Sequence, residues 1–179
     1  MKRLVTSCAV IVSLAVAIGV AARPFLPQSP KLPDKLRSLA GLKEVRLRVE
    51  IPDRLVQIGI TPSRIQQRCE VELRKVDIKI VSDLDTPEMI VKVMHLTEPE
   101  VPGAFAFNGR VSVKQRVVVP RIEQTIEAET FSVQMLGINK DGAARETIGP
   151  SILELLRRTT IAMQVATRHW EAEKREAGR

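Results

Sequence analysis

The longest alternating pattern in the chain, AFAFNGRVSVKQRVVV at residues 104–119, restricts the fold more than any other segment. One parity holds Phe105, Phe107, Val111, Val113, Val117 and Val119, and the other holds Asn108, Arg110, Ser112, Lys114 and Arg116. A period of two predicts a strand with one buried and one solvated face. Gly109 stands on the apolar parity and indicates a bulge or a close backbone approach.

Shorter segments predict the rest of a sheet. EVRLRVEI, residues 44–51, alternates in the same way, and Pro52 ends it. Apolar segments at 78–81 and 90–96 predict two more strands. ETFSVQMLGI, residues 129–138, predicts another and is followed by a turn or loop at 139–142.

Two segments have the period of an amphipathic helix. Thr61-Pro62 supplies an N-cap and a proline at the first helical position. A stripe follows that consists of Ile65, Cys69, Leu73 and Val76. A second helix is predicted from Pro150 to about Arg175. The order β-α-β-β-β-β-α predicts one α+β domain over residues 36–179, with an antiparallel-rich sheet of about five strands and two helices packed on one face.

An apolar segment at residues 4–22 determines the expected compartment. It has nineteen residues without a charge, between Lys2-Arg3 and Arg23. Small residues at its end favour a signal peptide cleaved after Ala22. Its length also suits an uncleaved membrane anchor of ~20 residues, which would give membrane contact through residues 4–22. Both alternatives place the domain outside the cytoplasm, in the periplasm or the extracellular space.

Cys8 and the residues that follow the apolar segment add two further expectations. Cys8 follows Arg3 too closely to end the roughly 7–15-residue apolar region of a lipoprotein signal, so we expect no lipid there. Residues 23–35 contain four prolines, at 24, 27, 30 and 33, and predict an extended linker.

Composition argues against a nucleic-acid partner. Without Lys2 and Arg3, 26 of the 28 basic residues remain against 21 acidic ones, and no long basic run is present. Aromatic residues make up 3% of the chain, which leaves few side chains for stacking on bases. We therefore expect no nucleic-acid binding.

Catalytic, cofactor and metal motifs are missing from the sequence. The chain has no G-x-S-x-G elbow, no H-E-x-x-H motif and no glycine-rich phosphate loop. After removal of residues 1–22, Cys69 is the one cysteine left, and its place on the predicted helix stripe favours a buried apolar role over pairing with a partner. The enzyme alternative rests on His95 acting with a carboxylate from the loop at 83–88, which includes Asp83 and Asp85.

One set of residues suggests a binding surface. If the apolar parity of each strand faces the helices, the opposite face of the sheet gathers Arg46, Arg48, Lys79, Arg110, Lys114 and Arg116. Such a cluster could bind an anionic lipid or a protein through charge-assisted hydrogen bonds. The alternative is an ordinary solvated face whose charges protect against edge pairing.

Several motifs resemble a known class of protein. They are L-x-G-L-x-x-V-x-L-x-V at 39–49, G-I-T-P-S-x-I at 59–65, V-E-L-R at 71–74 and V-x-V-x-Q-x-V at 111–117. Together they resemble small uncharacterised bacterial exported proteins with a single α+β domain. A similar element order occurs in envelope-assembly lipoproteins and in periplasmic domains of multiprotein complexes. The resemblance implies a protein that binds or scaffolds and is not an enzyme.

The leading hypothesis is therefore a non-catalytic envelope protein, without a cofactor, that binds an envelope protein or an anionic lipid through the sheet face or an exposed edge. Two alternatives remain open. One is the enzyme using His95, and the other is a structural subunit of an envelope assembly.

Overall fold

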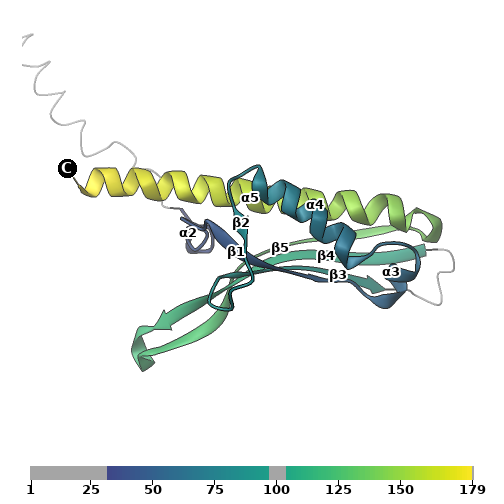
Figure 1. Ribbon diagram of the computed structural model, residues 1–179, viewed down its shortest axis with the longest axis horizontal. Helices are drawn as coiled ribbons and strands as arrows, with labels where there is room; N and C mark the ends of the chain where they lie inside the picture. The colour runs from purple at the N-terminus through teal and green to yellow at the C-terminus, as the bar shows by residue number, and fades with distance from the viewer. Residues whose placement is uncertain (1–31, 97–103, 179) are drawn as a thin grey trace, which may run out of the picture. The chain divides into compact units, whose positions relative to one another are not determined.

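The computed structural model describes residues 32–96 and 104–178, and a five-stranded sheet lies at its centre (Figure 1). Its strands are β1 (Glu44–Glu50), β2 (Lys79–Ile80), β3 (Glu88–Leu96), β4 (Ala104–Val119) and β5 (Gln124–Lys140), in the spatial order β2-β1-β3-β4-β5. The pairs β3–β4 and β4–β5 are antiparallel, whereas β1 pairs in parallel with β2 and β3. The predicted α+β class and strand number are confirmed, and the sheet is mixed because a helical crossover connects β1 to β2.

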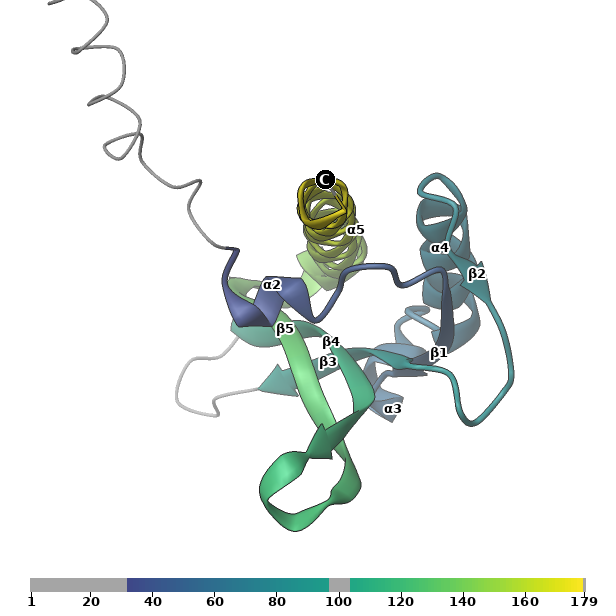
Figure 2. The same ribbon diagram turned by 90° about the vertical axis from the view of Figure 1, so that its left-hand side faces the viewer.

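The two long helices, α4 (Pro62–Arg74) and α5 (Ala144–Ala177), lie on the same face of the sheet (Figure 2). The remaining elements are α2 (Asp34–Arg37), α3 (Asp53–Gln57) and the 3-10 turns η2 (Pro120–Ile122) and η3 (Asp141–Ala143). With these short elements set aside, the predicted order β-α-β-β-β-β-α is confirmed. Within the described residues, no helix combines the length and apolar character needed to cross a bilayer.

The hydrophobic core fills the space between the sheet and the two long helices. Its fully buried members from the helices include Ile65, Cys69, Leu73, Ile152 and Leu155, and those from the sheet include Val45, Met89, Phe105, Phe107 and Val111. Burial of one large aliphatic side chain stabilises a fold by roughly 1.5–3 kcal/mol. The alternating pattern of β4 therefore determines which face α5 covers.

Gly109 allows α5 to approach the backbone of β4 closely. The sequence predicts either a bulge or such a close approach at this position. A Cβ atom at this position would lie 2.9 Å from Cδ1 of Ile152 and 3.2 Å from Cδ1 of Leu155. Two branched side chains of α5 thus occupy the space above the glycine. This contact sets the distance between α5 and the sheet.

The bulge lies in β5 instead. Val113 pairs with Phe131 and Lys114 pairs with Glu129, so Thr130 is the extra residue. The amide of Gln115 donates to the carbonyl of Ser38 and to Oγ1 of Thr130, at 2.8 Å each, and so ties the bulge to the end of α2. Because the extra residue interrupts the alternation, β5 begins at Gln124 and not at the predicted residue 129.

The last helix also begins earlier than predicted, at Ala144 and not at Pro150. A proline inside a helix cannot donate a hydrogen bond to the carbonyl of residue i−4, here Glu146. Both residues are exposed, so water can hydrate that carbonyl. Burial of Ala144 and Ile148 outweighs the lost hydrogen bond. The predicted turn at 139–142 is therefore divided between the end of β5 and η3.

Residues 1–22, with their predicted signal or anchor, lie outside the described residues, as does most of the predicted linker at 23–35. The described residues, 32–96 and 104–178, form one compact unit.

The Gly109 contact yields a prediction for stability. Gly109→Val places two methyl groups against Ile152 and Leu155, so we expect a loss of about 1–3 kcal/mol in the free energy of unfolding, measured with urea. Ala106→Val is the matched control, since Ala106 belongs to the same strand but to the opposite face and is partly exposed. Equal stability of the two variants would contradict the proposed role of this contact.

Candidate functional site

The face of the sheet opposite α4 and α5, which we call the open face, carries the six basic residues that the sequence predicts to form a binding surface. Residues paired in register lie on the same face. Arg46 is in register with Glu88, Glu88 with Lys114, and Lys79 with Glu44. Side chains alternate between the two faces along β1 and β4, and Lys79 of β2 shares the face of Glu44. All six basic residues therefore lie on the open face: Arg46, Arg48, Lys79, Arg110, Lys114 and Arg116. Whether this face binds an anion stays a prediction.

Carboxylates lie among these basic groups on β1 and β3. Arg46 contacts Glu88 at 3.0 Å. Arg48 contacts both Glu50, at 3.2 Å, and Glu88, at 3.5 Å. Lys92 contacts Glu50 at 3.2 Å. The side chain of Glu88 is only 12% exposed, so its two arginine partners are what compensate its charge.

Carboxylates also lie beside the basic residues of β4. Burial opposes ionisation of Glu129, but hydrogen bonds from Arg110 and Ser132 and the charges of Arg110 and Lys114 outweigh burial and lower its pKa. Arg116 contacts Asp85 at 2.8 Å. Sequence reasoning missed these pairings, although Glu88 and Glu129 both have strand-like neighbours that could have placed them opposite basic residues.

An apolar surface lies beside the charged rows, toward the end of the sheet where β3 finishes. Met94 is in register with Asn108, and Asn108 with Leu136, while Ile138 follows two residues further along β5. We call Met94, Leu136 and Ile138 the distal apolar patch. Their exposed fractions are 41%, 65% and 75%. Sequence reasoning missed this patch because it treated Leu136 and Ile138 only as members of a strand.

The patch adjoins a free strand edge. In the described chain no strand pairs with the outer side of β5, which has 17 residues and is about 58 Å long at 3.4 Å per residue. Contact with the α2 region occurs near the bulge, where Ser38 Oγ donates to the carbonyl of Thr130 at 3.3 Å. Natural proteins usually shorten, cover or charge such edges.

A second exposed apolar cluster lies at the tip of the β4–β5 hairpin, which projects away from α4 and α5 (Figure 1). It comprises Val118, Ile122 and Ile126, with exposed fractions of 69%, 49% and 43%. Val118 has the parity of the open face, whereas Ile126 is in register with Val117 and lies on the opposite face. The open face therefore has mixed charge in its middle, the distal apolar patch toward one end of the hairpin and Val118 toward the other.

The proposed enzyme constellation is not assembled. His95 stacks on Phe105 with ring centroids 5.7 Å apart. His95 lies seven positions after Glu88 on β3, about 23 Å along an extended strand. Asp85 pairs with Arg116 near the other end of the sheet.

Cys69 is fully buried, and burial, with smaller effects from Glu70 and Glu72, raises its thiol pKa to about 12. It is therefore a poor nucleophile in the folded chain. Among residues 32–96 and 104–178, no group of three or more His, Cys, Asp or Glu side chains could hold a metal ion.

No protein-family model and no curated protein sequence matches the chain. Solved structures are similar to it at low scores. One is rare lipoprotein B from Shewanella oneidensis, with 13% identity over 74% of this chain and 98% of that one, and a TM-score of 0.31. Another is a minor lipoprotein from Acinetobacter baumannii, with 11% identity over 75% and 95%, and a TM-score of 0.34. Both neighbours are bacterial lipoproteins, and at these scores they carry no statement about a ligand, partner or reaction.

The Arg110–Glu129 pair yields a prediction for pH dependence. Because the folded pKa of Glu129 is lowered, its ionised form stabilises the fold above the unfolded pKa, and this stabilisation is lost as pH falls through the folded pKa. Glu129→Gln should reduce the free energy of unfolding at pH 7 by less than about 1 kcal/mol, because the pair is partly exposed. The difference from the unmodified chain should shrink when urea unfolding is repeated at decreasing pH below the ordinary pKa of a glutamate. A difference that stays constant or grows as the pH falls would contradict this role.

Proposed function

We propose that the chain is a non-catalytic binding module of the bacterial cell envelope, which binds a protein partner through the distal apolar patch and the free edge of β5. The exposure of Leu136 and Ile138 is the observation that carries this proposal. Exposed contiguous apolar groups beside polar ones are typical of interaction sites. The envelope location rests on the apolar segment at residues 4–22, which indicates export or anchoring.

The chemistry of the site favours a protein as the partner. An extended segment could pair with the main chain of β5, while its apolar side chains contact Met94, Leu136 and Ile138. A lipid surface would need uncompensated basic groups. On the open face, however, Arg46, Arg48, Arg110 and Arg116 each contact a carboxylate. Anionic lipid is therefore the secondary candidate for this face.

The protein-partner proposal is tested by crosslinking in the native cell followed by mass spectrometry. A Leu136→Glu/Ile138→Glu double variant should lose the crosslinked partner, because two charges would be buried in the interface. Leu84→Glu is the control, since Leu84 is 71% exposed in the connection before β3 and lies outside the patch. Crosslinks that are identical in the double variant and in the unmodified chain would contradict the proposal.

The lipid candidate has a separate test. Charge reversal at Arg110, Lys114 and Arg116 should abolish pulldown by anionic vesicles at low salt if lipid binds the open face. Vesicle binding that is insensitive to these reversals would exclude that candidate. Light scattering of the unmodified chain and of the Leu136→Glu/Ile138→Glu variant shows whether a second copy of the chain occupies the patch instead.

A further inference from the structure

A cleft of about 420 Å³ lies on the helical side of the domain, remote from the open face. The beginning of α4, the beginning of α5 and the turn at residues 59–61 line it. Its volume is within the roughly 300–1,000 Å³ of small-ligand sites. Three arginines line it, Arg64 and Arg68 from α4 and Arg145 from α5, and we call it the arginine cleft.

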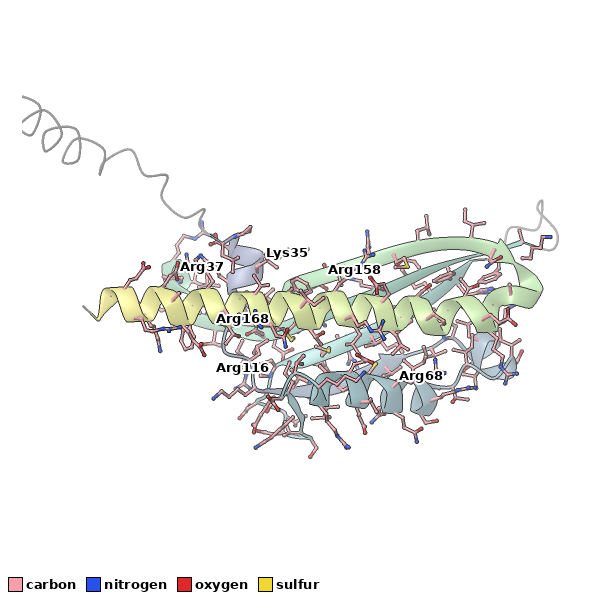
Figure 3. The ribbon with its side chains drawn as sticks, turned by 90° about the horizontal axis from the view of Figure 1, so that it is seen from above. Lys35, Arg37, Arg68, Arg116, Arg158 and Arg168 are labelled. Atoms are coloured by element: carbon pink, nitrogen blue, oxygen red, sulfur yellow. The ribbon has the colours of Figure 1, made fainter. Side chains whose placement is uncertain are left out.

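Two glycines make room for the guanidinium groups. Gly149 lies one helical turn after Arg145 on α5, and a Cβ atom there would be 3.0 Å from Nη1 of Arg68. A Cβ atom at Gly59, which has a φ of +84°, would be 2.5 Å from Nη2 of Arg145. The Arg68 guanidinium therefore lies between the two helices (Figure 3), and that of Arg145 lies against the turn before α4.

The charges in the cleft are not compensated. Among the described residues, no carboxylate lies within 4 Å of the side-chain nitrogens of Arg64, Arg68 or Arg145. Glu72, the next acidic residue along this side of α4, contacts Lys75 at 2.7 Å and Arg157 at 3.7 Å instead. This differs from the open face, where Arg46, Arg48, Arg110 and Arg116 each contact a carboxylate.

We propose that the arginine cleft binds a phosphate-type oxyanion. Guanidinium groups bind such oxyanions through paired, charge-assisted hydrogen bonds. Three of them suit a group with about −1.5 to −2 charges better than a singly charged carboxylate. The buried Ile65 lines the cleft, and Arg64 and Arg145 are exposed, so an oxyanion can reach the guanidinium groups from solvent. The site is separate from the partner surface proposed above and does not depend on it.

The binding test uses inorganic phosphate, titrated calorimetrically into the full-length chain, with acetate as the singly charged comparison. We expect saturable phosphate binding that exceeds acetate binding, and a loss of about tenfold or more in affinity for Arg68→Gln and for Arg145→Gln. Arg158→Gln is the matched control, because Arg158 lies on another side of α5 and contacts Glu154 at 2.9 Å (Figure 3). Its affinity should be unchanged.

Gly149→Ala separates binding from folding. Alanine favours a helix more than glycine does, and the one side-chain atom it approaches is the mobile end of Arg68. The variant should therefore keep or raise the melting temperature while its phosphate affinity falls. Weaker binding that accompanies a lower melting temperature would point to unfolding and count against the proposal.

A second arm distinguishes a free phosphate from a lipid headgroup. Vesicles of phosphatidylcholine with phosphatidic acid are compared with phosphatidylcholine alone, for Arg68→Gln and Arg158→Gln. Both variants share residues 4–22, so any difference between them reports the cleft. Vesicle binding that Arg68→Gln weakens indicates a lipid phosphate, whereas an effect on inorganic phosphate alone indicates a free one. Equal behaviour of Arg68→Gln, Arg145→Gln and the unmodified chain in both arms would overturn the proposal.

Discussion

The packing of α5 against β4 at Gly109 is the contact on which the domain depends. Ile152 and Leu155 approach the strand closely because that position has no side chain, and the rest of the core fills the space on either side. With α5 held there, α4 lies beside it and the opposite face of the sheet stays open. The open face, the free edge of β5 and the arginine cleft all follow from this one-sided arrangement.

Charge is distributed differently on the two sides of the domain. On the open face, carboxylates lie among the basic side chains, as in the row Arg46, Glu88, Lys114 and Glu129, which lowers the net field and leaves the apolar groups to provide attraction. At the arginine cleft, Arg64, Arg68 and Arg145 have no carboxylate partner among the described residues. An anion bound there would reduce the repulsion among these positive charges.

The sequence was enough to predict the class, the order of the long elements and the covered face, because the periods in residues 44–51, 62–76 and 104–119 are regular. It failed where a single residue changes the period, as Thr130 does in β5, or where tertiary packing tolerates Pro150 inside a helix. Register places the six basic residues on one face, and their role in binding stays a prediction. Their carboxylate partners and the arginine cleft depend on register and on helix proximity, which a one-dimensional pattern does not contain.

Helix α5 has two parts that differ in how they are held. Its buried residues end at Ala166, yet the helix continues to Ala177. Just past Ala166, Oγ1 of Thr167 accepts a hydrogen bond from the backbone amide of Gly41 at 3.1 Å. Further along, the helix has surface contacts, such as Arg37 with Glu173 at 3.2 Å and, within the helix, Lys174 over the Trp170 ring at 3.9 Å. Such contacts are worth little, so the last turns can open without the core. Backbone amides in these last turns should exchange with solvent by local fraying. Backbone amides of α5 near the buried Leu155 should exchange only when the whole domain unfolds.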